Sequence, residues 1–311
     1  MLRARTTVRH LGCAAKLSSS ISKRRASSIP IYQIDAFTSV PFRGNPAAIC
    51  PLDKWLPDAT LQAIAMENNL SETAFIIPSD LGAETTNECV YNLRWFTPTV
   101  EVDLCGHATL ATGSLILEHL EPHREEVMFD TRSGRLMVKK GVDGQLCMDF
   151  PLWPVAEEVP IPGALLHAMG TQPQRTYKIP PQHGAPYFLL EYGSVDEVMA
   201  LAPSFDAMPA NVLATALVHQ HPALPEDLKS ADFVCRFFGP KSGIPEDPVT
   251  GSAHCTLAPF WSERLSGKKV LRSVQVSKRR GELLLELETK GRVSISGRCA
   301  LFLEGKLRLP D

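Results

Sequence analysis

The sequence predicts an α+β protein built from two related lobes. Three observations lead to this prediction. The chain has 311 residues, enough for two domains of about 150 residues each. Short runs rich in β-branched and aromatic residues alternate with a few amphipathic helical segments. The second half of the chain also repeats motifs of the first half in the same order.

The predicted elements follow one another from residue 30 onward. The strand-like runs are IYQIDAF (31–37), TAFII (73–77), LRWF (93–96), YFLLEY (187–192) and FVCRFF (233–238). Apolar residues at helical spacing predict helices over 57–69, where Asp58 is the expected N-cap, and over 192–203. The Pro-rich stretch 151–162 is the expected linker between the lobes.

The internal repeat places one half of the chain over the other. The matching pairs are RWFTP (94–98) with RFFGP (236–240), GHATLATGSLILEHL (106–120) with GSAHCTLAPFWSERL (251–265), and 127–150 with 274–297. Each match is weak alone, but their common order at offsets of 142, 145 and 147 residues indicates a duplication. This period exceeds the roughly 20–50 residues of solenoid repeats. Each copy is therefore predicted to form a lobe with a strand, a glycine-led helix and several further strands.

A Gly-polar-Ala triplet opens the predicted helix of each copy, at Gly106–His107 and at Gly251–Ser252. The first N–H groups of a helix lack partners within it, and the helix dipole adds positive charge there. If a pseudo-two-fold axis relates the lobes, both helix N-termini face one cleft, where we expect a carboxylate to bind. Taken singly, Ser252 would be an N-cap and His107 a surface histidine. Their equivalent placement favours a functional site instead.

Two further features lie beside these triplets. Asp247 precedes Pro248, which favours an extended or turn conformation close to the cleft. Cys105 and Thr250 occupy equivalent positions just ahead of the two helices. Two cysteines there would indicate a two-base racemase, and the single thiol disfavours that chemistry.

The charge of the chain is unevenly placed. Residues 1–29 carry seven basic residues, six serines and no acid, so the formal charge of −2 becomes −9 for the remainder. This segment has the composition either of a mitochondrial transit peptide or of a disordered basic tail. The acidic remainder argues against a nucleic-acid partner, and no apolar run is long enough to span a membrane. We expect an intracellular soluble protein, in the mitochondrial matrix or in the cytoplasm.

Cofactor motifs are missing from the sequence. The eight cysteines include no C-x-x-C pair, which is typical of free thiols in a reducing compartment. No phosphate-binding glycine motif or H-E-x-x-H motif is present, and the Cys and His residues are too sparse for a metal site. We therefore expect no metal, nucleotide or flavin, and a site that works by side-chain acid/base chemistry.

Four stretches of the chain are distinctive when taken together: IDAFTSVPFRGNPAAIC (34–50), NNLSETAFIIP (68–78), LRWFTPTVEVDLCGHATLA (93–111) and GIPEDPVTGSAHCTLA (243–258). In combination they resemble the PhzF-like phenazine-biosynthesis isomerase family. The likeness runs from about residue 31 to the C-terminus and is greatest to the animal-type phenazine biosynthesis-like domain proteins. It implies the diaminopimelate epimerase fold: two pseudo-symmetric lobes, each a curled, mostly antiparallel sheet around a central helix, with the site between them.

The resemblance also implies roles for individual residues. It places on Glu72 the general acid/base of a cofactor-free isomerisation, which moves a proton between carbons of a cyclohexadiene carboxylic acid. Partial desolvation is expected to raise the pKa of Glu72 toward the working pH. His107 and Asp247 match further catalytic residues, which we expect to orient the substrate and stabilise charge. The matching substrate-binding residues are Gly106, Gly251 and Ser252.

One position departs from the family pattern. Arg280 stands where family members have a glycine, and a local change follows if that glycine needs a positive φ or close packing. The predicted organisation is a leader over 1–29, lobes over 30–150 and 151–298, and a terminal strand over 299–311 that returns to the N-terminal lobe. A homodimer is consistent with the resemblance.

The leading hypothesis is a cofactor-independent isomerase of a small unsaturated cyclic carboxylic acid, with Glu72 as the proton carrier. A second hypothesis is a racemase or dehydratase of an amino or imino acid, in which Cys105 would serve as the single base. A third is a non-catalytic protein that binds a ligand or a protein partner. The retention of Glu72, His107, Asp247 and Ser252 together argues against the third.

Overall fold

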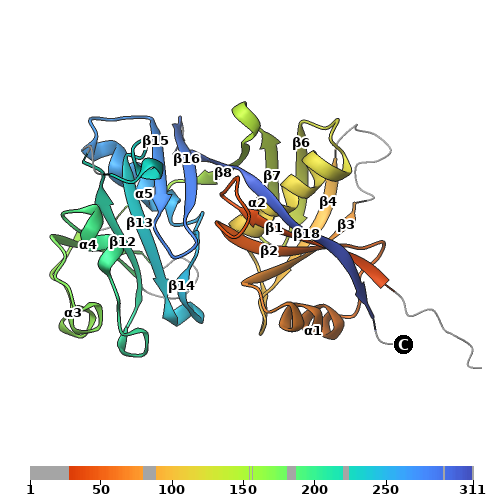
Figure 1. Ribbon diagram of the computed structural model, residues 1–311, viewed down its shortest axis with the longest axis horizontal. Helices are drawn as coiled ribbons and strands as arrows, with labels where there is room; N and C mark the ends of the chain where they lie inside the picture. The colour runs from red at the N-terminus through yellow and green to blue at the C-terminus, as the bar shows by residue number, and fades with distance from the viewer. Residues whose placement is uncertain are drawn as a thin grey trace, which may run out of the picture.

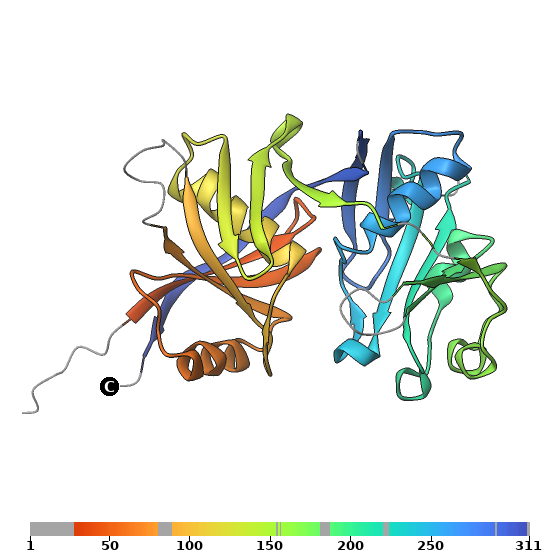
Figure 2. The same cartoon turned by 180° about the vertical axis from the view of Figure 1, so that it is seen from behind.

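The computed structural model describes residues 28–79, 89–153, 155, 157–180, 187–219, 224–289 and 291–309. Figures 1 and 2 show two lobes side by side, with the N-terminal half of the chain in one and most of the C-terminal half in the other. The leader expected over 1–29 lies outside the described residues except for Ser28 and Ile29. These two residues belong to the first strand, where they pair with Arg308 and Leu307.

The first eight of the described strands lie in the N-terminal lobe. They are β1 (Ser28–Ala36), β2 (Asn45–Pro51), β3 (Glu72–Pro78), β4 (Val90–Phe96), β5 (Glu101–Val102), β6 (Glu126–Thr131), β7 (Gly134–Lys140) and β8 (Leu146–Pro151). The strands that follow are β9 (Glu157–Glu158), β10 (Arg175–Ile179), β11 (Tyr187–Glu191), β12 (Asn211–Leu217), β13 (Phe233–Gly239), β14 (Ile244–Asp247), β15 (Val270–Gln275), β16 (Gly281–Glu288), β17 (Arg292–Gly297) and β18 (Cys299–Arg308). β18 leaves the C-terminal lobe and runs antiparallel to β1 in the N-terminal lobe (Figure 1).

The described helices are few and mostly short. They are α1 (Asp58–Asn68), α2 (Gly106–Ser114), α3 (Gly163–Met169), α4 (Val195–Ala200) and α5 (His254–Arg264). α2 continues into a π-helical segment, η1 (Leu115–Leu120), and the 3₁₀ turns are η2 (Val142–Gly144), η3 (Phe205–Ala207), η4 (Glu226–Leu228) and η5 (Pro240–Ser242). In the part of the chain that the structure describes, no helix is long and apolar enough to cross a membrane.

The strands of the two lobes pair in the same succession. In the N-terminal lobe β2–β3 and β4–β6 are parallel, whereas β1–β2, β3–β4, β6–β7 and β7–β8 are antiparallel. In the C-terminal lobe β11–β12 and β13–β15 are parallel, whereas β10–β11, β12–β13, β15–β16 and β16–β17 are antiparallel. The β8–β17 pair joins the lobes. The predicted α+β class with two mostly antiparallel lobes is confirmed.

A buried helix fills the centre of each lobe. α2 contacts β1, β2, β3, β7 and β8, so the sheet curves around it, and all its residues from His107 to Ser114 are buried. A Cβ atom on Gly113 would lie 2.5 Å from Val138 Cγ1, so only glycine permits this close approach. In the second lobe α5 packs against β16 and β17, and Trp261 stacks on Phe233 with ring centroids 5.7 Å apart.

Two predicted helix starts differ in detail from the structure. The helix expected over 57–69 is α1, but its N-cap is Pro57 and not Asp58. Asp58 is the first helical residue, and its carboxylate pairs with Arg94 at 2.9 Å. The helix expected over 192–203 is the shorter α4, where the Ser194 hydroxyl accepts a hydrogen bond from the Glu197 N–H at 3.2 Å. Asp58 therefore forms an ion pair in place of the expected cap of α1, and α4 begins later than expected, after the cap Ser194.

The segment after β1 holds the two lobes together. Phe37 is fully buried with a φ of 64°, and its carbonyl accepts a hydrogen bond from the Glu282 N–H at 2.9 Å. Arg279 donates to Asp35 Oδ1 at 2.9 Å and to the Gly44 carbonyl at 2.9 Å. Arg280, at the position where the resemblance implies a glycine, has a φ of 56°, a left-handed conformation that costs about 1–2 kcal/mol for a residue with a side chain. Its guanidinium pairs with Asp227.

Candidate active site

A pocket of about 490 Å³ lies between the lobes, and all six predicted site residues line it. The six are Glu72, Gly106, His107, Asp247, Gly251 and Ser252. The walls also include Cys105, Thr250 and the aromatic side chains of Phe150, Trp153 and Phe237. A smaller cavity of about 120 Å³, bordered by Arg272 and Arg298, includes none of the six. The pocket that brings all six together is therefore the candidate active site.

Two helix N-termini meet at this pocket. α2 begins at Gly106 as predicted, after Cys105 in an extended conformation, and its first i→i−4 bond runs from the Thr109 N–H to the Cys105 carbonyl at 3.1 Å. α5 begins at His254 and not at Gly251, because residues 251–253 form a tight turn. In that turn the His254 N–H donates to the Gly251 carbonyl at 3.0 Å. The first triplet therefore lies in the first turn of α2, and the second lies directly ahead of α5. A helix N-terminus favours a bound carboxylate at both positions.

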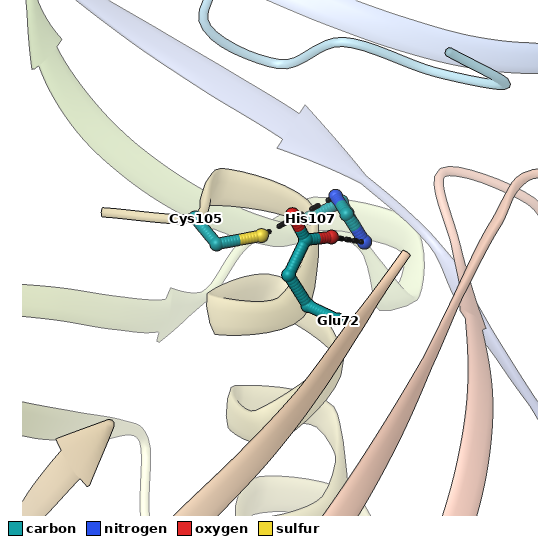
Figure 3. Close-up of side chains that lie close together, drawn as sticks. All are labelled: Glu72, Cys105 and His107. Carbon is teal, nitrogen blue, oxygen red and sulfur yellow. Dashed lines mark hydrogen bonds and ion pairs between the residues drawn. The ribbon is translucent and has the colours of Figure 1, made fainter. Parts of the chain in front are cut away.

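Glu72, Cys105 and His107 form a buried cluster on the wall of the N-terminal lobe (Figure 3). Glu72 is the first residue of β3, and its side chain is directed to the start of α2, where the other two lie. His107 Nε2 is 3.2 Å from Glu72 Oε2, and His107 Nδ1 is 3.5 Å from Cys105 Sγ. The contact with Glu72 is a close ion pair without the alignment of a strong hydrogen bond.

The ion pair sets the charge of both partners. Burial opposes ionisation of Glu72, but the positive charge of His107 at close range, aided by the Cys105 thiol, holds the pKa of Glu72 below its ordinary value. Burial would likewise lower the pKa of His107, but Cys105 and Glu72 raise it well above its ordinary value. The expected rise in the pKa of Glu72 toward the working pH is therefore wrong, although burial does act in that direction. At neutral pH the carboxylate is ionised and able to accept a proton.

Cys105 supplies a protonated thiol beside this pair. Burial raises the pKa of Cys105 to about 11, so the thiol keeps its proton at neutral pH. The donor atoms of Glu72, Cys105 and His107 lie within 4.8 Å of one another, a set of O, S and N ligands that suits zinc. A metal ion at this site would have to displace protons from both the thiol and the imidazolium.

Asp247 faces this cluster from the C-terminal lobe, at the end of β14. Burial raises its pKa to about 6, although the charge of His107 and the hydrogen bond from Thr250 act in the opposite direction. Asn45 Nδ2 donates to Asp247 Oδ1 at 2.8 Å, and the Thr250 hydroxyl donates to Asp247 Oδ2 at 2.5 Å. Gln275 supports the same loop, because its Nε2 donates to the Asp247 carbonyl at 2.7 Å. The site thus holds two carboxyl groups whose pKa values are moved in opposite directions.

The raised pKa of Asp247 predicts a pH-dependent stability. Since its folded pKa of about 6 exceeds the ordinary 3.8, the fold disfavours the ionised form, and stability is lost as pH rises between these values. Above pH 6 we expect Asp247→Asn to need a higher urea concentration to unfold than the unchanged protein. Its free energy of unfolding should be greater by up to about 3 kcal/mol, at 1.36 kcal/mol per pKa unit. At about pH 3, below both pKa values, the two proteins should be equally stable. Asp53→Asn, at an exposed position, is the control, and a gain independent of pH would contradict the assignment.

Several residues at the pocket could not be selected from the sequence. Trp153 lies in the stretch predicted as a linker, yet it lines the pocket, and its backbone N–H donates to the Cys255 carbonyl at 3.0 Å. Asn45 lies inside one of the four family-like stretches, which is a signal that could have drawn attention to it. Gln275, fully buried on β15, lies in no such stretch.

The fold and the site define the class of protein: a two-lobed α+β protein with buried ionisable residues from both lobes at a central pocket. The family model described as PhzC-PhzF, phenazine biosynthesis-like protein, matches residues 34–305. The chain belongs to this family.

Similar proteins agree with this assignment. An uncharacterised isomerase of Pseudomonas aeruginosa is 44% identical over 285 residues, which cover 90% of this chain and 99% of that protein. The phenazine biosynthesis-like domain-containing protein of Bos taurus is 38% identical, with 90% and 99% covered. The crystal structure of a PhzF-family protein from Enterococcus faecalis has a TM-score of 0.78 and 39% identity, covering 91% of this chain and all of that one. These relatives place the chain among the isomerases.

More distant proteins share the fold alone. A hydroxyproline epimerase of Agrobacterium vitis, solved with trans-4-hydroxy-L-proline bound, has a TM-score of 0.51 at 11% identity. The match covers 90% of this chain and 91% of the epimerase. The two-lobed architecture is therefore common to proteins whose sequences have otherwise diverged.

Proposed function

We propose that this protein is a cofactor-independent isomerase that moves a proton between carbons of a small unsaturated cyclic carboxylic acid. One observation carries the proposal: a single pocket joins two helix N-termini to a buried, ionised Glu72 that is paired with His107. The helix ends suit the carboxylate of the substrate. The buried pair supplies a proton acceptor and a positive charge beside it.

The reaction follows from these positions. The substrate carboxylate lies at the amides of Gly106 and Gly251, and the ring lies against the aromatic walls of the pocket. Glu72 accepts a proton from a ring carbon, and the electron pair of the broken C–H bond spreads into the conjugated system and the carboxylate. The His107 imidazolium stabilises this negative charge. Protonated Glu72 then returns the proton to another ring carbon, so that a double bond moves and no electrons are gained or lost.

Proton NMR in deuterium oxide tests this function. The protein is incubated with a dihydro-hydroxyanthranilate and with a panel of cyclic unsaturated acids, amino acids and imino acids. We expect at least one cyclic unsaturated acid to show shifted vinyl signals and deuterium at a new ring carbon. Exchange at the α-carbon of an amino or imino acid, with every cyclic unsaturated acid unchanged, would overturn the proposal.

That outcome would support a second function, a racemase or dehydratase of an amino or imino acid. The observation in its favour is the Cys105 thiol, which lines the pocket 3.5 Å from His107 Nδ1. The opposite wall offers Thr250 and no second thiol at the equivalent position, and the raised pKa of Cys105 suits a proton donor better than a base. Loss of turnover in Cys105→Ser with retention in Glu72→Gln would distinguish this function from the first.

A further inference from the structure

Asn45 is a buried residue that joins the two lobes at the site. It begins β2 in the N-terminal lobe and is fully shielded from solvent. Its Nδ2 reaches the C-terminal lobe, where it donates to Asp247 Oδ1 at 2.8 Å and to the Val249 carbonyl at 2.9 Å. Within the described residues, its own Oδ1 has no hydrogen-bond partner. A buried oxygen without a partner lowers stability, so Oδ1 does not explain why an asparagine stands here. The two hydrogen bonds that Nδ2 donates do explain it.

The carboxylate of Asp247 thus receives one hydrogen bond from each lobe. Asn45 binds Oδ1 from the N-terminal lobe, and Thr250 binds Oδ2 from the loop that follows β14. The charged groups that act on this carboxylate are His107 and Glu72, both from the N-terminal lobe. Gln275 on β15 contacts the backbone carbonyl of Asp247 and not the carboxylate. Asn45 is therefore the link by which the N-terminal lobe fixes the direction of this side chain.

We propose that Asn45 is a positioning residue for the reaction, whose amide holds the Asp247 carboxylate in place across the lobe boundary, facing the Glu72–His107 pair. This inference rests on the proposed function, since it concerns the same site. It assigns to Asn45 an effect on the ionisation of Asp247 that a packing role would not have. Loss of a donor to a carboxylate favours its protonated form.

The test compares pH–rate profiles of Asn45→Ala and the unchanged protein. We expect kcat to fall on the order of tenfold with little change in KM. The Asp247 limb, defined as the limb of the pH–rate profile that is lost in Asp247→Asn, should move to higher pH by about one unit. In the Asp247→Asn background, adding Asn45→Ala should change kcat less than about twofold, because the two residues act as one unit. Asn45→Leu, which has nearly the same volume but no donor and no charge, serves if the alanine variant does not fold. It should move the limb at least as far.

Asn211→Ala is the matched control. Asn211 is also a buried asparagine, but its amide contacts Ser242 and the Lys241 N–H. We expect this variant to lose stability without moving the Asp247 limb. If Asn45→Ala likewise lowers stability and kcat while the limb stays in place, or if its effect persists fully in Asp247→Asn, Asn45 is structural and the inference fails.

A measurement without turnover separates this inference from the proposed function. The pH dependence of urea unfolding reports the ionisation of Asp247 even when no substrate is known. In the unchanged protein, ionisation of Asp247 should appear as a fall in the free energy of unfolding with rising pH, and this fall should be absent from Asp247→Asn. We expect it to occur at higher pH in Asn45→Ala. That shift in a protein inactive on every compound of the panel would uphold the coupling and reject the proposed reaction. No shift in an active protein would reject the coupling and leave the reaction standing.

Discussion

Replacing Glu72 by glutamine is expected to lower kcat for isomerisation, and for deuterium uptake, by about 10²–10⁴-fold. Glutamine has nearly the same shape, but its amide cannot accept the proton that the carboxylate accepts. Asp247, the other carboxyl group at the pocket, is held by Asn45 and Thr250 and lies on the opposite lobe. Binding of the substrate carboxylate should change little, because the helix N-termini that hold it are untouched.

The comparison needs a glutamate that lies away from the pocket. Glu67, exposed on α1, provides it, and Glu67→Gln is expected to keep the kcat of the unchanged protein. Steady-state rates followed by proton NMR, together with circular dichroism to verify folding, decide the result. Deuterium uptake by Glu72→Gln within about threefold of the unchanged protein would show that another group carries the proton.

The elements of the fold were predictable where the residue pattern alone determines them. The runs at 73–77, 93–96 and 233–238 became β3, β4 and β13, because buried β-branched and aromatic residues fill a sheet that is covered by a helix. The start of α5 was not predictable in this way. Pro248 and the glycine that follows at 251 favour a turn, and that turn extends three residues beyond the expected helix start.

The composition of the site was predictable, but its electrostatics were not. The motifs named Glu72 and His107 separately, and nothing in the sequence states that the two side chains lie 3.2 Å apart. That distance reverses the direction of the Glu72 pKa shift, because His107 and Cys105 together outweigh the effect of burial. Asn45 was likewise hidden, since its contact with Asp247 joins residues 202 positions apart. Only the closure of two lobes on one another creates that contact.

Replacing His107 by asparagine should destabilise the protein by about 3–5 kcal/mol and lower kcat at the same time. The change leaves the Glu72 carboxylate buried without its cation, so its pKa should rise and the corresponding limb of the pH–rate profile should move to higher pH. The lowered pKa of Glu72 contributes stability above its ordinary value of 4.5, and this contribution is lost as pH falls through the folded pKa. The raised pKa of His107 contributes stability below 6.5, and this is lost as pH rises through its folded pKa. In urea unfolding, the difference in free energy of unfolding between His107→Asn and the unchanged protein should therefore be largest within the range from pH 4.5 to pH 6.5.

The double variant Glu72→Gln/His107→Asn separates the cost of the unpaired charge from the loss of packing. Removing both charges leaves no buried ion without a partner, so most of the stability lost in His107→Asn should return. Activity should not return, because the proton acceptor is gone. If the double variant were as unstable as His107→Asn, the loss would come from the missing ring at the start of α2 and not from the carboxylate. Recovery of stability without recovery of turnover would show that the ion pair is kept for chemistry, since the fold can do without its charges.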